Sequence, residues 1–258
     1  MRCTVSALHT DWIRSVFVSN DGSLIATGSD DNTLALYSVA ARKIVGRARI
    51  FSGAFSVVLS PDASRVYSAS GDIRVWSVPK MVRAYASRAE LDASGKHCAE
   101  VTGLDISADG RFAASVCPCS NSEGKCVGLQ IRAWSCETGC VLGRFLVPGS
   151  ANDDDCPTCL CLSTDGSLVS VCADTGKFWV LPLQEKAAPL WIEVEAHEKR
   201  ITCCQWLDED TFATGSEDGT VKSWSVGGKR CVAKVQVHVR DVRCLAFTRD
   251  NQCVLTGG

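Results

Sequence analysis

Cysteine residues offer the most reactive chemistry in this sequence. The chain has 16 cysteines among 258 residues, and some are closely spaced: Cys117 and Cys119 flank a proline, Cys126 follows a polar insertion, and Cys156 follows an acidic stretch. Cysteine thiolates bind zinc in tetrahedral sets. A metal site formed by Cys117, Cys119, Cys126 and Cys156 is therefore one hypothesis. The C-x-C-x6-C spacing is not typical of zinc sites, so inert thiols are the preferred interpretation.

All four histidines share one sequence context. Each precedes a β-branched apolar residue by four positions, in the pairs His9 and Ile13, His97 and Val101, His197 and Ile201, His238 and Val242. A fixed spacing indicates one equivalent structural position. We therefore expect structural histidines, with none left for a catalytic dyad or a metal site.

Other catalytic patterns are missing from the sequence. The three carboxylates of Asp153 to Asp155 can meet a divalent cation or a basic partner, but such runs more often form solvated loops. The sequence contains no glycine-rich phosphate loop, no nucleophile with an available base and no zinc-hydrolase pair. We expect no enzymatic activity, no cofactor and no small-molecule substrate.

Composition narrows the class of protein. The chain is 46% hydrophobic and 22% charged, which is typical of a folded domain. Its 27 basic and 29 acidic residues give a net charge of −2, which disfavours direct binding to nucleic acid. No apolar run approaches the ~20 residues of a membrane span, and residues 1–10 lack the apolar core of a signal peptide. We expect an intracellular protein, cytoplasmic or nuclear, with mostly reduced thiols.

A repeat of about 40–45 residues runs through the chain. Turn segments with an aspartate recur at spacings of 41, 47, 56, 43 and 42 residues; the aspartates are Asp21, Asp62, Asp109, Asp165, Asp208 and Asp250. Each turn lies between apolar or alternating runs, which are typical of short strands. Several short strands per repeat of this length predict the blades of a β-propeller.

Small residues mark a second repeating column. They stand near the start of each expected inner strand: Ser15, Ser56, Gly103, Cys159, Cys203 and Cys244. Strands that converge on a narrow axis need small side chains, and cysteine serves there as a compact buried hydrophobe. Packing therefore accounts for three of the cysteines.

The segment from His197 to Trp224 resembles a repeat of the WD-repeat β-propeller family. After the histidine it contains a run from Phe212 to Thr220 that reads FATGSEDGT, and it ends on the tryptophan. The resemblance implies a buried hydrogen-bonded network of His197, Thr214, Asp218 and Trp224, because a buried indole and imidazole need partners.

The other repeats match the family pattern to different degrees. The first has His9, Thr27, Asp31 and Tyr37; the second has Ser68 and Trp76 without a histidine; the third has His97, Ser115 and Trp134; the sixth begins with His238. The fourth is degenerate, with Thr175 at the aspartate position and Leu181 at the tryptophan position.

The resemblance implies an all-β fold, a β-propeller of four-stranded antiparallel blades. We expect one domain over residues 1–258, with five blades and half of a sixth, incomplete at the C-terminus and part of a six- or seven-bladed ring. Residues 2–8 are expected to form an outer strand. The sixth blade is expected to have strands at 242–247 and 253–256.

The resemblance to this family also implies that the protein is a non-catalytic scaffold, which binds other proteins in a multi-subunit complex. The loops before the inner strands often bind partners in family members; the matching residues here are Trp12, Glu100, Lys199, Arg200, Arg240 and Asp241. Exposed tryptophan and arginine are typical interface anchors. The alternative is a metal- or redox-responsive module that uses the cysteine loops of the third and fourth repeats.

Overall fold

The computed structural model of the chain describes residues 8–50, 56–70, 73–84, 91–92, 99–120, 126–138, 140–148, 155–183, 190–193, 195–248 and 250–258. The chain divides into two compact units, residues 1–101 and residues 102–258. We call them the N-terminal unit and the C-terminal unit, and describe each by itself.

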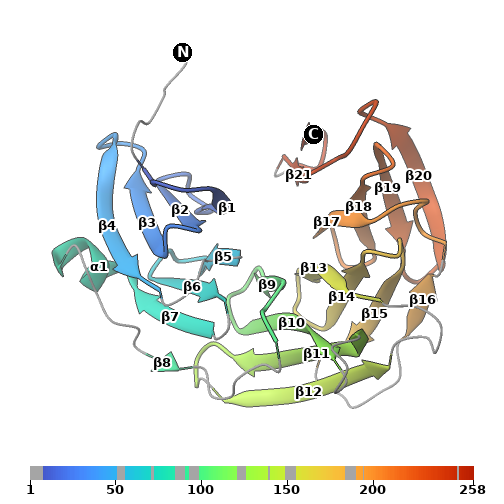
Figure 1. Cartoon of the computed structure of the whole chain (residues 1–258), viewed down its shortest axis with the longest axis horizontal. Coiled ribbons are helices and arrows are strands. Elements are labelled where there is room, and N and C mark those ends of the chain that lie inside the picture. Colours follow the sequence, from blue (N-terminus) through green and yellow to red (C-terminus); the bar gives the residue numbers. More distant parts are fainter. Residues whose placement is uncertain are drawn as a thin grey trace. The chain divides into compact units, whose positions relative to one another are not determined.

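The N-terminal unit contains two four-stranded antiparallel sheets (Figure 1). The strands of the first sheet are β1 (Ile13–Val18), β2 (Leu24–Ser29), β3 (Thr33–Ser38) and β4 (Lys43–Arg49). Those of the second sheet are β5 (Ser56–Leu59), β6 (Arg65–Ala69), β7 (Ile73–Ser77) and β8 (Leu91–Asp92). In both sheets, strands that follow one another in sequence are hydrogen-bonded neighbours.

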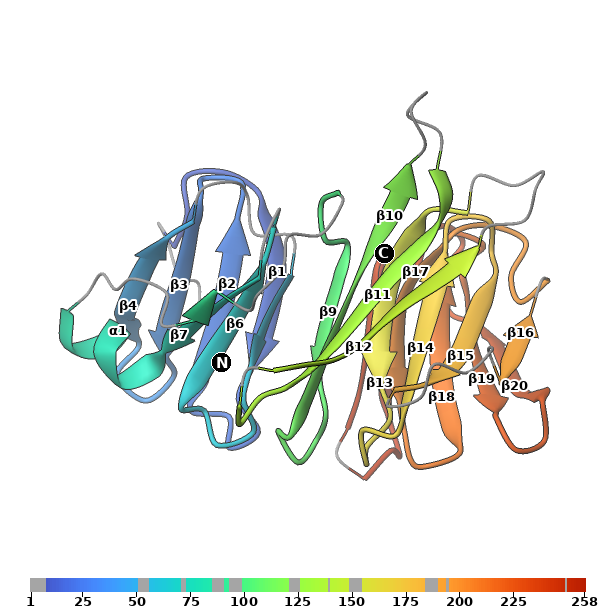
Figure 2. The same ribbon diagram turned by 90° about the horizontal axis from the view of Figure 1, so that it is seen from below.

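The C-terminal unit contains three four-stranded sheets and a two-stranded one. The third sheet has β9 (Gly103–Ile106), β10 (Phe112–Ser120), β11 (Cys126–Ser135) and β12 (Val141–Pro148); the fourth has β13 (Pro157–Leu162), β14 (Leu168–Ala173), β15 (Phe178–Pro182) and β16 (Trp191–Glu193). The fifth has β17 (Ile201–Trp206), β18 (Thr211–Ser216), β19 (Thr220–Ser225) and β20 (Arg230–Gln236); the sixth has β21 (Cys244–Phe247) and β22 (Val254–Gly257). Strands β10 and β11 are long, and their hairpin extends past the shorter strands of the fourth sheet (Figure 2).

The predicted fold class is confirmed. Over the described residues the structure has five four-stranded antiparallel sheets and one two-stranded sheet, as the repeats predict. The sixth sheet differs in its bounds: β21 begins two residues later than predicted, and β22 ends at Gly257. The predicted outer strand at 2–8 falls almost wholly outside the described residues.

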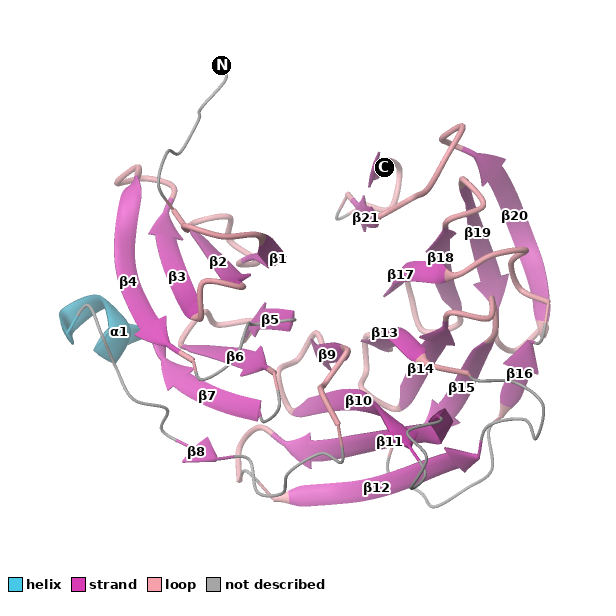
Figure 3. Ribbon diagram, viewed as in Figure 1, coloured by secondary structure: helices cyan, strands magenta, loops and turns pink. Residues whose placement is uncertain are grey.

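One helix, α1 (Val78–Ala84), was not expected from the strand pattern (Figure 3). The Ser77 hydroxyl accepts a hydrogen bond from the Lys80 backbone N–H, and Pro79 lies in the first turn, so local residues favour the helix start. Met81 is fully buried beside Gly46 of β4. In the described part of the chain, no helix has the length and apolar character needed to cross a bilayer.

Five of the six aspartate turns that define the repeat share one hydrogen-bond pattern, and Asp208 instead accepts from the Asp210 and Thr211 N–H groups. In the turn between β1 and β2, Asp21 Oδ1 accepts bonds from the Ser19 hydroxyl at 2.6 Å and from the Ser23 N–H at 3.0 Å. The same 2.6 Å hydroxyl bond is made to Asp62, Asp109, Asp165 and Asp250. The residue after each of these aspartates has a positive φ; these residues are Gly22, Ala63, Gly110, Gly166 and Asn251.

The first strands of neighbouring sheets lie side by side within each unit: β1 with β5, β9 with β13, β13 with β17, and β17 with β21. The small residues predicted to form a column occupy equivalent register positions on these inner strands, Ser15 facing Gly28 and Cys203 facing Gly215. Gly103 shows how close the strands approach, because a Cβ there would lie 2.9 Å from the Leu160 backbone nitrogen. Small residues are therefore a steric requirement of this packing.

Apolar side chains between adjacent sheets form the cores. In the N-terminal unit, Leu34, Leu36, Val57 and Trp76 belong to one buried cluster. In the C-terminal unit one cluster joins the third and fourth sheets, and another joins the fourth and fifth around Phe178. The core thus repeats from sheet to sheet, and no single sheet buries its faces alone.

We predict that Gly103→Val destabilises the protein by about 1–3 kcal/mol, because the added side chain overpacks the contact between β9 and β13. Urea unfolding followed by circular dichroism measures the change. Gly227→Ala is the control, since its Cβ would meet only the Asp210 carboxylate. Equal stability of both variants would contradict the steric requirement.

Candidate functional site

The fifth sheet contains a continuous chain of buried polar contacts that involves all four residues named from the sequence. His197 Nδ1 lies 2.9 Å from Asp218 Oδ2, and His197 Nε2 lies 2.8 Å from Thr214 Oγ1. The Trp224 indole N–H donates to Thr214 Oγ1 at 2.8 Å. The donors then have one consistent direction: indole to hydroxyl, hydroxyl to Nε2, and Nδ1–H to carboxylate. His197 is therefore neutral, with its proton on Nδ1.

Burial and hydrogen bonding shift both ionisable groups of this chain. Burial lowers the pKa of His197, although the hydrogen bond to Asp218 opposes the shift. Burial raises the pKa of Asp218, but hydrogen bonds from Thr220 and His197 outweigh it and lower the pKa to about 2. At neutral pH this site is a neutral imidazole beside a carboxylate, and among the described residues the threonine hydroxyls are the nucleophiles that contact it.

The first sheet repeats this geometry with tyrosine in place of tryptophan. His9 Nδ1 lies 2.9 Å from Asp31 Oδ2, and His9 Nε2 lies 2.8 Å from Thr27 Oγ1. Burial raises the pKa of Asp31, but hydrogen bonds led by that from Thr33 lower it to about 2. Tyr37 is buried at the register position that Trp224 has in the fifth sheet.

The remaining sheets keep parts of the network. In the second, the Trp76 indole N–H donates to Ser68 Oγ at 2.9 Å. In the third, Ser115 is buried but the buried indole nitrogen of Trp134 has no hydrogen-bond partner among the described residues. His97 lies outside the described residues. In the sixth, His238 Nε2 lies 3.0 Å from Thr256 Oγ1.

The fourth sheet reverses the charges, which sequence analysis missed. Asp155, before β13, is 1% exposed; its Oδ1 accepts a bond from the Thr175 hydroxyl at 2.6 Å and lies 3.2 Å from Lys177 Nζ. Thr175 and Lys177 occupy the positions that Asp218 and Thr220 have in the fifth sheet. The carboxylate therefore comes from the loop before β13, and its partners come from the turn between β14 and β15. Asp155 is not part of a solvated loop, whereas Asp153 and Asp154 lie outside the described residues.

The cysteines considered as a zinc set do not converge where the structure describes them. Cys117 and Cys119 lie on β10, opposite Gln130 and Gly128, and Cys156 precedes β13. The side chain of Cys126 lies outside the described part. Among described side chains, the group of three or more potential metal ligands is a different one: Cys159, Cys172 and Cys204, whose sulfur atoms lie within 4.8 Å of one another.

The residues predicted for partner binding lie on loops before inner strands. Trp12 and Glu100 are exposed in the N-terminal unit, Trp12 at 71%, with the Arg14 guanidinium 5.1 Å from its ring centroid. Lys199, Arg200 and Arg240 are exposed in the C-terminal unit. Asp241 is half-buried and pairs with Arg243, which also contacts Glu217.

A repeated backbone contact fixes these loops. The carbonyl before the inner strand accepts a bond from the residue after the second strand: Trp12 from Asp30, Cys156 from Asp174, and Arg200 from Glu217. Trp12, Cys156 and Arg200 are thus structurally equivalent. Their carbonyls are fixed, and the side-chain type alone varies from sheet to sheet.

We predict that His197→Ala lowers stability by about 1–3 kcal/mol at pH 7.5, because Asp218 and Thr214 lose a buried partner. Below pH 6.5 the unfolded chain binds a proton on this histidine more readily than the folded chain, whose pKa is lowered. Wild-type stability therefore falls as pH drops below 6.5, and the fall should be shallower in the variant. Urea unfolding at pH 7.5 and 5.5 measures the loss of stability in each protein. An equal loss in the wild type and the variant would contradict this prediction.

We also predict that Lys177→Met costs about 3–5 kcal/mol, because it leaves the Asp155 carboxylate buried without its cation. The double variant Asp155→Asn/Lys177→Met should recover most of that loss, since it removes both charges. Thermal unfolding of the three proteins measures this. A double variant no more stable than Lys177→Met would show that the pair is not coupled.

Comparison with known proteins agrees with these features. The family model described as WD domain, G-beta repeat matches residues 3–38, 190–225 and 229–258. A p21-activated protein kinase-interacting protein 1-like protein of Danio rerio is 27% identical over 250 residues, which cover 96% of this chain and 60% of the relative. The ribosome biogenesis protein WDR12 homolog of Oryza sativa subsp. japonica is 25% identical over 282 residues, covering 97% of this chain and 63% of the relative.

A third relative, WD repeat-containing protein RUP1 of Arabidopsis thaliana, is 33% identical over 96 residues, covering 36% of this chain and 24% of the relative. The chain thus spans less than two thirds of the length of each of these relatives. The chain thus contains WD repeats in three segments, and its four-stranded antiparallel sheets and His–Asp–Thr–Trp hydrogen bonds are those that the resemblance to this family implies.

Proposed function

We propose that this chain is a non-catalytic scaffold that binds other proteins through the loops before its inner strands. Two lines of support come from the comparisons. The chain contains WD repeats, and two of its relatives are named for protein association: the kinase-interacting protein of Danio rerio, and a serine-threonine kinase receptor-associated protein of Dictyostelium discoideum. No partner is carried over from those names.

The observation that carries this proposal is the combination of fixed backbone and exposed side chains in these loops. Arg200 is exposed while its carbonyl is held by Glu217, and Trp12 is exposed while its carbonyl is held by Asp30. A preorganised loop loses little conformational entropy when a partner binds. Exposed tryptophan and arginine can then act as anchors at low entropic cost.

The C-terminal unit indicates the chemistry of one partner. The loops that contain Arg200 and Arg240 both contact the turn between β18 and β19. In that turn the Glu217 N–H donates to the Arg200 carbonyl oxygen, and a Cβ on Gly219 would lie 2.7 Å from the Arg240 carbonyl oxygen. Lys199 adds a third exposed cation, whereas Arg243 is paired with Glu217 and Asp241. This surface suits an acidic segment of a partner protein.

We predict that the double variant Lys199→Glu/Arg200→Glu loses a subset of the proteins that copurify with the wild-type chain. The chain provides a matched control, because Lys229 and Arg230 form a second exposed Lys-Arg pair at the start of β20, away from these loops. The Lys229→Glu/Arg230→Glu variant should keep the full set. Affinity purification with quantitative mass spectrometry makes the comparison.

Two results would overturn the proposal. One is identical partner sets for both variants and the wild type. The other is a wild-type chain whose copurifying proteins all disappear after nuclease treatment, with an affinity for RNA that falls steeply as salt rises, which would indicate nucleic-acid binding instead.

A further inference from the structure

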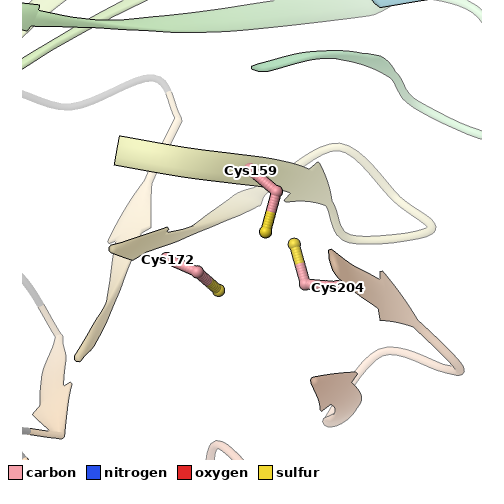
Figure 4. Close-up of side chains that lie close together, drawn as sticks. All are labelled: Cys159, Cys172 and Cys204. Atoms are coloured by element: carbon pink, nitrogen blue, oxygen red, sulfur yellow. The ribbon is translucent and has the colours of Figure 1, made fainter. Parts of the chain in front are cut away.

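A group of three thiols lies between the fourth and fifth sheets, within the C-terminal unit (Figure 4). Cys159 is on β13, Cys172 on β14 and Cys204 on β17, and all three sulfur atoms lie within 4.8 Å of one another. The sulfur atoms of Cys159 and Cys204 point toward each other, and Cys172 lies beside them on the neighbouring strand. Three elements therefore contribute one soft ligand atom each.

Strand register explains why these thiols meet. Cys159 faces Cys172 directly across β13 and β14, and β17 packs against both strands. Cys159 and Cys204 pack against the buried cluster that contains Cys172. The group rests on the closest approach of two inner strands, where the backbone is fixed by sheet pairing on both sides.

A fourth sulfur lies next to this group. Cys161 is buried in the same apolar cluster as Cys172, against which Cys159 and Cys204 pack. It occupies the inner-strand position that Asp105 has in the third sheet and Gln205 in the fifth, counting two residues on from Gly103, Cys159 and Cys203. Those two side chains reach the next inner strand, where Asp105 accepts from Leu162 N–H and Gln205 from Phe247 N–H. The same position directs Cys161 toward β17.

Packing alone does not require cysteine at these positions. The residues equivalent to Cys172 are Gly28, Ala69, Val116, Gly215 and Gly257, and those equivalent to Cys204 include Val16, Val57 and Leu160. Apolar residues without a ligand atom thus satisfy the same packing in the other sheets. Cysteines occupy these positions between the fourth and fifth sheets, where their sulfur atoms lie close to one another.

We propose that Cys159, Cys172 and Cys204, with Cys161 as the fourth ligand, bind one thiophilic cation with a filled d shell. Zn²⁺ and Cu⁺ share this chemistry, because both prefer thiolate sulfur. In a tetrahedral zinc site with Zn–S bonds of ~2.3 Å, neighbouring sulfur atoms lie about 3.8 Å apart, so the sulfur atoms of Cys159, Cys172 and Cys204 need to approach one another by at most about 1 Å.

Binding is balanced by proton release. Each thiol that becomes a ligand exchanges its S–H bond for a sulfur–metal bond and gives its proton to solvent, and no atom changes oxidation state. Metal uptake by this group should therefore acidify an unbuffered solution.

The first experiment uses the wild-type chain, reduced and treated with a chelator. It is loaded with Zn²⁺ in one arm and with Cu⁺ under anaerobic conditions in the other, desalted, and analysed for metal per chain. We expect about one ion per chain in one arm, and protection of Cys159, Cys172 and Cys204 from iodoacetamide, mapped by mass spectrometry and reversed by chelation. Protection of Cys161 as well is the result expected for zinc. No retained ion in either arm, or protection at other cysteines, would overturn the proposal.

A variant pair provides the second test. Cys172→Ala/Cys204→Val introduces residues that the other sheets use at the same positions, so we expect a folded chain, checked by its thermal midpoint. It should retain less than a tenth of the wild-type metal. Cys117→Ala/Cys119→Ala/Cys156→Ala, which alters the cysteine loops instead, should retain all of it. The reverse pattern would assign the metal to Cys117, Cys119 and Cys156 and would overturn this site. If the first variant fails to fold, the alkylation map of the wild type decides between the two sites.

Discussion

The close approach of neighbouring inner strands is the constraint on which the rest of each unit depends. At Gly103 a single added carbon would lie 2.9 Å from the Leu160 backbone nitrogen, so large side chains are excluded from this column. The same proximity brings backbone N–H groups of one strand within reach of the next sheet. Ser15 accepts from Val57 N–H, and Asp105 accepts from Leu162 N–H. These bonds satisfy donors that have no partner in their own sheet. Burial raises the pKa of Asp105 to about 6 even though two backbone N–H bonds oppose the shift, so a charged acceptor there carries a desolvation penalty.

The loops before β1, β13 and β17 pose a second constraint, because each brings a polar side chain into a buried position. Two charge arrangements satisfy it. In the first and fifth sheets an imidazole comes from the loop and a carboxylate from the turn between the second and third strands. In the fourth sheet Asp155 comes from the loop, and Thr175 and Lys177 come from the turn between the second and third strands. In either arrangement each buried polar or charged group has a hydrogen-bonding or ionic partner, which low-dielectric surroundings require. In each of these sheets a polar side chain from the loop is paired with side chains from the turn between the second and third strands, and the sequence decides which member is acidic.

This explains how far the sequence predicts the structure. The aspartate turns, the small column and the histidine spacing reflect local or periodic constraints, so the four-stranded sheets and the contacts of His9 and His197 were predictable from one chain. The reversed pair was not, because the histidine spacing that pointed to His9 and His197 has no counterpart before β13, so nothing in the sequence marked Asp155 and Lys177 as a pair. Helix α1 was not predicted either, since a seven-residue helix leaves no clear 3.6-residue periodicity. The group of three thiols was not predictable for a third reason. Cys159 and Cys203 were assigned to packing, whereas Cys204, one residue further on, faces the other way along the strand and meets the fourth sheet.

The thiol group and the loops share strands, which connects the interior to the proposed binding surface. Cys159 is three residues after Cys156, whose carbonyl anchors the loop of the fourth sheet, and Cys204 is four residues after Arg200, whose carbonyl anchors the loop of the fifth. An ion held by these thiols would join β13, β14 and β17, and would therefore fix the spacing between two loops that present side chains to a partner. Binding of an ion and binding of a partner that contacts both loops would then be linked, each favouring the other by the same free energy. Without an ion, β17 is joined to the β13–β14 pair by side-chain packing, so metal would act on partner affinity through loop spacing rather than through direct contact.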